Sequence, residues 1–214
     1  MTRMIIVRHG QSTGNLGGRF LGHYDGELTN LGRRQAERAA DYLKNEKIDI
    51  AYASDLSRAY ETGSIIAVPH RLVPIKDQNL REIFAGKWEN VEFTKIAEQY
   101  PDDWKLWLDD AFRSRPTDGE SVMELMTRVT SEFWKIASEN NGKTVLVATH
   151  ATPIRTLMRE WQEMGALEGG PKWVSNASVT TVEYYPESHT VKVIKLSDSS
   201  FLEGMRTDLG SDEV

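Results

Sequence analysis

Two histidines and two arginines follow short apolar segments of the chain, and these residue types suit the transfer of a phosphoryl group. Arg8 and His9 come directly after the apolar residues 4–7. His150 follows the apolar segment 144–149, and Arg58 lies shortly after a third such segment at 48–53. An imidazole can attack phosphorus and carry the phosphoryl group covalently, and the planar guanidinium of arginine pairs with two phosphate oxygens at once. The sequence therefore predicts a phosphohistidine on His9, with the other three side chains holding the phosphate.

A proton donor for the leaving group is the second requirement, and Glu82 is the candidate. It would protonate the departing alkoxide, then accept a proton from water when the phosphohistidine is hydrolysed. The carbonyl of Gly10 would hold the proton on the second ring nitrogen of His9 and so fix its tautomer. Acids are common in loops, so three rivals to Glu82 stay open: Asp25, Glu61 and Glu89. The neighbouring Arg81 is either an outward-facing helper or plain surface.

The bulk composition limits what else the protein can be. The chain has 214 residues, with 39% hydrophobic and 27% charged residues, which are ordinary values for one soluble α/β domain. It has no cysteine, which excludes disulfides, a thiolate nucleophile and zinc–thiolate sites. The net charge of −6 argues against a broad nucleic-acid surface, and the apolar segments are too short to span a bilayer. We expect a cytoplasmic protein without a secretory signal.

Apolar and amphipathic segments alternate along the chain and predict the elements that position these side chains. We expect strands at 4–7, 48–53, 71–75 and 144–149, and two more at 179–184 and 190–196 around a turn. Helices are expected at 29–43, capped by Thr29, and at 56–67, 121–139 and 151–164. This alternation predicts an α/β fold, a three-layer sandwich whose mostly parallel central sheet has helices on both faces.

The segment 91–118 differs from the rest because it combines many acids with large aromatic residues. We interpret it as a short helical insertion that caps the site, within a single domain of residues 1–214. Its aromatic side chains form either the insertion's own core, which we favour, or an apolar wall for the substrate. The residues concerned include Trp104, Trp107 and Phe112. The polar tail from about residue 203 is expected to be mobile.

Several short motifs follow one another in a fixed order. They are RHGQS at 8–12, LTNLGRRQA at 28–36, SDLSRAYET at 54–62, LRE at 80–82, GES at 119–121 and TH at 149–150. This order resembles the histidine phosphatase superfamily, which includes cofactor-dependent phosphoglycerate mutase, fructose-2,6-bisphosphatase and α-ribazole phosphatase. The resemblance implies that His9 accepts the phosphate and that Glu82 donates the proton. It also implies a phosphate and substrate pocket formed by Arg8, Asn15, Gly22, Arg58, His150 and Ala151.

The same resemblance favours a phosphatase over a mutase. Mutases of the family place a tyrosine shortly after the acid, then a lysine, then an adjacent arginine pair in a long insertion. Here Ala85 and Phe93 stand in place of the tyrosine and the lysine. The nearest arginines, Arg113 and Arg115, are not adjacent, and Leu21 replaces the hydroxyl residue that precedes the pocket glycine in mutases. Fewer cations should hold a carboxylated bisphosphate poorly, so we expect hydrolysis.

Alternatives to a metabolite phosphatase stay open at this point. One is a phosphoglycerate mutase, and a second is a metal-dependent hydrolase with His9, His150 and Glu82 as ligands, although two arginines would repel a cation there. A third is a module that binds a phosphorylated ligand without turning it over, and His150 taken alone is as readily a core histidine. We expect no cofactor and no metal. The expected partner is a small phosphorylated metabolite, not nucleic acid or a membrane, and the expected state is a monomer or homodimer.

Overall fold

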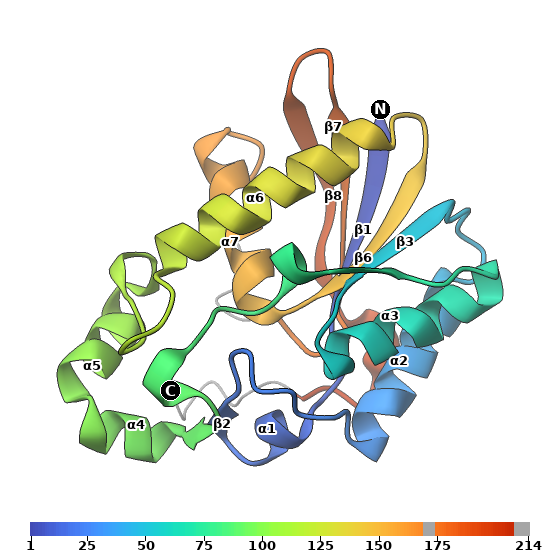
Figure 1. Cartoon of the computed structure of the whole chain (residues 1–214). Helices are drawn as coiled ribbons and strands as arrows, with labels where there is room; N and C mark the ends of the chain where they lie inside the picture. The colour runs from blue at the N-terminus through green and yellow to red at the C-terminus, as the bar shows by residue number, and fades with distance from the viewer. Residues whose placement is uncertain (169–173, 208–214) are drawn as a thin grey trace.

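A six-stranded sheet forms the middle layer of the molecule, with its strands in the order β4-β3-β6-β1-β7-β8 (Figure 1). The structure is a computed structural model that describes residues 1–168 and 174–207. The strands of this sheet are β1 (Thr2–Arg8), β3 (Ile50–Ser54), β4 (Ile75–Asp77), β6 (Thr144–Thr149), β7 (Val179–Tyr185) and β8 (Thr190–Asp198). The four strands β4, β3, β6 and β1 are parallel, whereas β7 runs antiparallel to β1 and β8 antiparallel to β7. The predicted α/β class with a mostly parallel sheet is confirmed.

The longer helices lie on both sides of the sheet. They are α2 (Asn30–Leu43), α3 (Ser57–Ala67), α6 (Val122–Glu139) and α7 (Ala151–Glu163). Figure 1 shows α2 and α3 on one side of the sheet and α6 and α7 on the other. Thr29 caps α2 by accepting from the Gly32 amide at 3.0 Å, as predicted, and Ser121 and Glu124 form a capping box at the start of α6.

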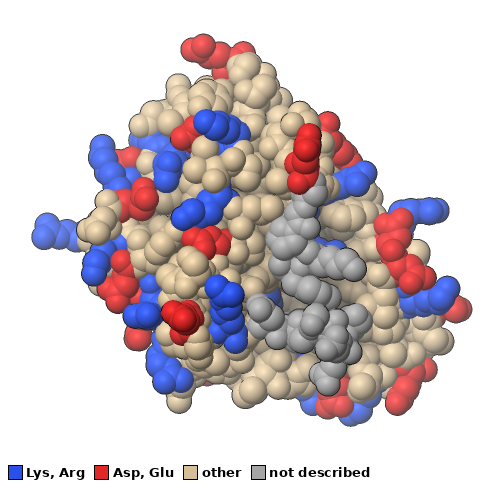
Figure 2. Space-filling model, turned by 180° about the vertical axis from the view of Figure 1, so that it is seen from behind, with Lys and Arg blue, Asp and Glu red and all other residues tan. Residues whose placement is uncertain are grey.

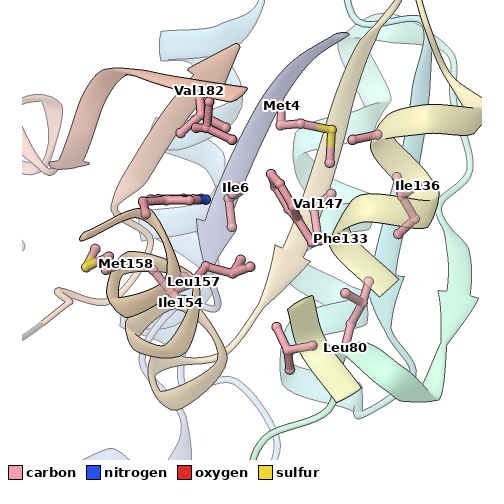
Figure 3. Packing of buried hydrophobic residues seen from close by; sticks show 14 of the residues in the cluster. Met4, Ile6, Leu80, Phe133, Ile136, Val147, Ile154, Leu157, Met158 and Val182 are labelled. Carbon is pink, nitrogen blue, oxygen red and sulfur yellow. The ribbon is translucent and has the colours of Figure 1, made fainter. Parts of the chain in front are cut away.

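Alternate side chains of β1 enter the two cores, because successive residues of a strand point to opposite faces. Met4 and Ile6 pack with α6 and α7, and this cluster also contains Phe133 and Leu157 (Figure 3). Ile5 and Val7 pack instead with α2 and α3. A strand covered on both faces is apolar throughout, which explains why β1 and β6 are continuous apolar segments in the sequence.

The predicted insertion is a chain of short elements beside the sheet. It contains β5 (Val91–Glu92), α4 (Phe93–Gln99), α5 (Pro101–Asp109) and a 3₁₀ turn at Ala111–Arg113. The strand β5 pairs with β2 (Arg19–Phe20), which follows α1 (Thr13–Leu16). Figure 1 shows α1, β2 and α4 near the end of β1 that is opposite to the N-terminus. The pairing of β2 with β5 therefore joins the insertion to the loop that follows His9.

One predicted strand is wrong, because the third strand occupies Ile75–Asp77 rather than residues 71–75. Arg71 has a positive φ of 58°, which is incompatible with extended backbone, and Pro74 has no amide hydrogen for a ladder. Val73 is 78% exposed, so its apolar side chain did not indicate a buried strand. The remaining 3₁₀ turns are Val68–His70, Gln78–Leu80, Gly86–Trp88 and Ser200–Leu202.

The predicted tail is partly described. Through Thr207 it packs against the domain, since Gln35 donates to the Met205 carbonyl at 2.7 Å and to the Thr207 hydroxyl at 3.1 Å. The rest of the predicted tail lies outside the described residues. Within the described ranges no helix is long and apolar enough to cross a membrane. On the described part of the face seen in Figure 2, basic and acidic side chains are interspersed.

Candidate active site

The pairing of β1 with β6 brings the two predicted histidines together. The strands are parallel neighbours, and Arg8 pairs in register with Thr149. The residue after each strand is a histidine, and the His9 amide donates to the Thr149 carbonyl at 2.9 Å. As a result the rings of His9 and His150 lie edge to face with centroids 5.2 Å apart. The carboxyl edge of the parallel strands is therefore the place where the chemistry-bearing residues converge, as the sequence predicted.

His9 has the tautomer that a nucleophile needs. Its Nδ1 lies 2.7 Å from the Gly10 carbonyl oxygen, which can only accept a hydrogen bond, so Nδ1 carries the proton and Nε2 carries the lone pair. Burial, followed by the positive charges of Arg58 and Arg8, holds the pKa of His9 well below its usual range. His9 is therefore neutral at pH 7, with an unprotonated Nε2. The predicted contact with Gly10 is present in the structure.

His150 is fully buried and held by a hydroxyl group. Its Nε2 lies 2.8 Å from the Ser54 Oγ, and its Nδ1 has no hydrogen-bond partner among the described residues. Burial and the charge of Arg58 hold the pKa of His150 well below its usual range. The neutral tautomer with hydrogen on Nδ1 would present that N–H to an oxyanion. A core histidine with both nitrogens satisfied, the alternative left open above, does not match this arrangement.

Arg58 is a buried cation, and some of its N–H groups remain available to a ligand. Its side chain is 1% exposed, and its two terminal nitrogens donate to the Tyr24 carbonyl at 2.9 Å and the Gly22 carbonyl at 2.7 Å. These bonds use two of its five N–H groups, and Nε has no partner among the described residues. Burial lowers the pKa of Arg58 to about 10, against the opposing charge of Glu82. A cation kept out of water in this way is stabilised by an incoming phosphate dianion.

Arg8 and Asn15 are also fixed before any ligand arrives. Arg8 is buried, and its guanidinium donates to the Val174 carbonyl. The Asn15 Oδ1 accepts from the Ser12 amide at 3.0 Å and from its hydroxyl at 2.9 Å, so the oxygen end of the side chain faces the protein. Asn15 also lines the cavity, and its amino group is the end left to donate to a phosphate oxygen.

Glu82 is the only carboxylate among the described residues that line the cavity. Its two oxygens accept from the Ile83 amide at 2.9 Å and the Thr152 amide at 3.3 Å, the latter in the first turn of α7. The three rivals are engaged elsewhere. Glu61 pairs with Arg33, Asp25 accepts from the Ser57 amide, and Glu89 binds backbone amides. Arg81 pairs with Asp55 at 2.5 Å.

Glu89 holds two active-site loops together. One of its oxygens accepts from the amides of His23 and Ala85, both at 2.8 Å, and the other accepts from the Tyr24 amide at 2.5 Å. The first loop supplies the carbonyls that orient Arg58, and the second follows Glu82. Gly22 lies in the first loop with φ +55°, and a Cβ there would come within 2.2 Å of the Glu89 carboxylate. Glycine at 22 is therefore required by the backbone and by the close approach of Glu89.

A single cavity gathers most of the predicted residues. Those that line it are Arg8, His9, Asn15, Gly22, Arg58, Glu82 and Ala151. The insertion contributes Phe93, Trp104 and Trp107 to the wall, whereas Phe112 lines a separate groove and packs under Arg159. The wall aromatics also pack on one another and on Trp88, whose side chain is fully buried. Trp104 and Trp107 therefore belong to the insertion's own core and also line the cavity, whereas their contact with a substrate stays a prediction.

Sequence reasoning missed several residues of the cavity wall. They are Ser12, Arg19, Phe20, Thr152, Arg155 and Val174. Ser54, which holds His150, was noted only as part of a motif. Arg155 had a signal that could have found it, because it follows Ala151 by four residues on a predicted helix and residues at that spacing share a face. Arg19 and Phe20 line the cavity because β2 pairs with β5. Nothing in their local sequence indicates this pairing.

Comparisons with known proteins show the family of this chain. A profile of the histidine phosphatase superfamily (branch 1) matches residues 4–197. Phosphoserine phosphatase 1 from Hydrogenobacter thermophilus is 32% identical over 157 residues, which are 73% of this chain and 74% of that protein. Phosphoglycerate mutase-like protein 4 from Arabidopsis thaliana is 36% identical over 162 residues, which are 72% of this chain and 68% of that protein.

A solved structure has the same fold. The structure of YhfR from Bacillus stearothermophilus aligns with a TM-score of 0.85 and 29% sequence identity, over 94% of this chain and 100% of that one. The structural match and the profile both extend over nearly the whole sheet and its helices. The chain belongs to the histidine phosphatase superfamily.

Proposed function

We propose that this protein is a phosphatase of small phosphorylated metabolites that works through a phosphohistidine on His9. Family membership and the similarity to a protein named phosphoserine phosphatase support the phosphatase activity. The observation that carries the mechanism is the hydrogen bond from His9 Nδ1 to the Gly10 carbonyl. It leaves the Nε2 lone pair to attack phosphorus in a cavity that Arg8 and Arg58 also line.

The reaction has two steps that mirror each other. In the first, Nε2 of His9 bonds to phosphorus while the ester oxygen leaves, and Glu82 gives that oxygen a proton. In the second, Glu82 takes a proton from water, the water oxygen bonds to phosphorus, and His9 is released with inorganic phosphate. Arg8 and Arg58 bind the equatorial oxygens, where charge spreads in the transition state. His150 and Asn15 add neutral donors to the same oxygens.

The positions of Arg113 and Arg115 favour hydrolysis over isomerisation. Arg113 lines the separate groove rather than the active-site cavity. Arg115 donates to the Gly119 carbonyl and pairs with Glu124 at 2.8 Å. Within the part of the chain that the structure describes, neither arginine therefore lines the cavity, where a mutase would need the pair to hold a carboxylated bisphosphate. Water can then reach the phosphohistidine.

A metal-dependent hydrolase is disfavoured by charge. His9 and His150 both lie under the electrostatic influence of Arg58 and Arg8, whose charges oppose a cation at the same place. No three His, Cys, Asp or Glu side chains among the described residues are grouped so that they could hold a metal ion. We therefore propose catalysis without a metal or an organic cofactor. A cytoplasmic location is part of the same proposal.

The test of the function is an assay of the purified protein against phosphomonoesters, with and without EDTA. Inorganic phosphate should be released at the same rate in both conditions. In parallel, 3-phosphoglycerate is supplied with catalytic 2,3-bisphosphoglycerate, and both 2-phosphoglycerate and free phosphate are followed. Isomerisation that outpaces phosphate release would contradict the phosphatase assignment, and loss of activity in EDTA would contradict metal independence.

A further inference from the structure

The segment that carries Glu82 has little secondary structure of its own. After the 3₁₀ turn Gln78–Leu80, residues 81–85 belong to neither a helix nor a strand. The side chains of Leu80 (Figure 3) and Ile83 are buried in the core that α6 also packs into. The backbone carbonyls of such a segment need hydrogen-bond partners from other elements, because no helix or strand pairing supplies them. The place of Glu82 in the cavity therefore depends on these partners.

Arg128 of α6 binds three of these carbonyls. Its Nη1 donates to the Asn79 carbonyl at 2.8 Å and to the Arg81 carbonyl at 3.1 Å. Its Nη2 donates to the carbonyl of Glu82 itself at 3.3 Å. A single guanidinium, attached to a regular helix, therefore fixes the backbone that leads to Glu82.

Glu120 fixes Arg128 in turn. The Nε and Nη2 of Arg128 donate to the two carboxylate oxygens of Glu120 at 3.0 and 2.8 Å, a bidentate geometry that orients both groups. The two side chains are only 21% and 16% exposed. Together with the three carbonyls, these contacts occupy the five N–H groups of the arginine. Glu120 also accepts from the Phe84 amide at 3.2 Å, so the pair holds the segment on both sides of Glu82.

The Glu82 carbonyl has a second donor. The Nε2 of His23 lies 2.8 Å from the Glu82 carbonyl oxygen, which can only accept, so this ring nitrogen carries the proton. The Leu80 carbonyl accepts from the hydroxyl of Thr149, the last residue of β6, at 2.7 Å. Beyond its own segment, the Glu82 carboxylate accepts from the Thr152 amide at 3.3 Å. The direction in which this carboxylate enters the cavity therefore follows largely from a backbone that other elements hold in place.

We propose that Arg128, oriented by Glu120, is a positioning residue that sets the place of Glu82 relative to the leaving oxygen of the substrate. Arg128 is not among the described residues that line the cavity, so it acts through the backbone of Glu82 rather than on the substrate. A displacement of about 1 Å in a reacting group can cost about 10²-fold in rate. The inference rests on the proposed phosphatase function, in which Glu82 protonates the leaving group.

The experiment uses the leaving group as the readout, because a general weakening of the fold would not distinguish between esters. Single-turnover phosphorylation rates are measured for p-nitrophenyl phosphate and for an alkyl ester, the faster of glycerol 3-phosphate and 3-phosphoglycerate. The variants are Arg128→Met, Arg128→Lys and Glu120→Gln, and Arg128→Met is also combined with Glu82→Gln. Arg115→Met is the matched control, because Arg115 likewise pairs with a glutamate of α6, Glu124 at 2.8 Å. Circular dichroism and urea denaturation show whether each variant is folded.

We expect Arg128→Met to lower the rate with the alkyl ester by about 10- to 100-fold. The loss with p-nitrophenyl phosphate should be at least about tenfold smaller, because a nitrophenolate leaves without a proton. In the Glu82→Gln background the same substitution should cost less than about threefold, since the group that Arg128 positions is already gone. Glu120→Gln should show a smaller loss of the same kind. Arg128→Lys should recover only part of the rate, because an ammonium group lacks the planar fork.

Several results would overturn this inference without touching the phosphatase proposal. Equal losses on both esters by folded Arg128→Met would mean that this residue supports the fold alone, and full additivity with Glu82→Gln would mean that the two act independently. Full recovery by Arg128→Lys would mean that charge matters rather than position. The same selective loss in Arg115→Met would mean that any weakening of this region has that effect. If Arg128→Met does not fold, Arg128→Lys and Glu120→Gln make the same comparison.

Other results would contradict the proposed function itself. Equal losses on both esters by Glu82→Gln would remove Glu82 as the proton donor, and the role of Arg128 with it. A wild type that acts on p-nitrophenyl phosphate but on neither alkyl ester would contradict proton donation to an alkoxide. A wild type that releases phosphate from none of the three esters would contradict the phosphatase proposal.

Discussion

The imidazole rings of His9 and His150 lie edge to face, 5.2 Å apart, and neither ring is charged at neutral pH. Two protonated imidazoles at this distance would repel each other and the arginines beside them. The neutral pair with Arg8 and Arg58 instead forms a site whose positive charge resides on the guanidinium groups. Such a site is suited to a dianion, and the bound phosphate would in turn favour protonation of His150.

A titration should therefore find two histidines that stay neutral in mild acid. We expect the NMR ring signals of His9 and His150 to titrate well below about 6.5, the usual histidine value. Because the unfolded chain binds these protons and the folded chain does not, the free energy of unfolding should fall as the pH drops below about 6.5. Signals are assigned with His9→Ala and His150→Asn. Midpoints at or above the usual value would contradict the charge distribution described here.

Phosphate or vanadate at saturating concentration should then raise the titration midpoint of His150. The dianion replaces water next to the ring and favours its charged form. An unchanged His150 midpoint in the bound state would exclude it from the phosphate pocket.

Replacement of Glu82 by glutamine should separate substrates by their leaving groups. An alkoxide needs a proton as it departs, so the phosphorylation step with alkyl phosphates should slow by about 10²- to 10⁴-fold. A nitrophenolate leaves without that proton, so the burst with p-nitrophenyl phosphate should be much less affected. Single-turnover burst rates on both substrates make the comparison. Equal losses on the two would count against Glu82 as the acid.

Glu89→Gln should give a different pattern, because Glu89 binds backbone amides rather than substrate. The substitution replaces one carboxylate oxygen, which accepts hydrogen bonds, with an NH₂ group, which donates them. This NH₂ group faces the backbone N–H groups of His23, Tyr24 or Ala85. We expect the free energy of unfolding to fall by about 1–3 kcal/mol and both classes of ester to lose activity by similar factors. Urea denaturation and the two burst assays measure this. A selective loss on alkyl phosphates would instead make Glu89 a participant in proton transfer.

Much of the fold could be predicted because the pattern of apolar residues and the helix-capping residues indicate the same bounds for the elements. The strand at Thr144–Thr149 and the helices capped by Thr29 and Ser121 have the expected bounds within about a residue. The edge strand β4 could not be placed, since an edge strand needs no continuous apolar pattern and Val73 is exposed. The composition of residues 91–118 indicated a segment unlike the rest, but the pairing of β2 with β5 is a long-range contact that local sequence does not encode.

The site could be predicted only in part. Residues at strand ends converge by topology, which is why His9, His150 and Arg58 were found. The family resemblance favoured Glu82, but local sequence alone does not distinguish it from Glu89, a carboxylate of the same chemical type seven positions later. Only the contacts show that one lines the cavity and the other holds loops. Arg155 was missed because a basic residue on an amphipathic helix is more often solvated.

The most direct test of the mechanism is to trap the phosphoenzyme. Wild-type protein is mixed with p-nitrophenyl [³²P]phosphate, quenched within milliseconds, and its protein-bound label is tested for stability in acid and base. The label should be acid-labile and base-stable, as a phosphohistidine is, and should be absent from His9→Ala, whose fold is checked by circular dichroism. Label on folded His9→Ala, or a tenth of wild-type turnover by that variant, would contradict a covalent intermediate on His9.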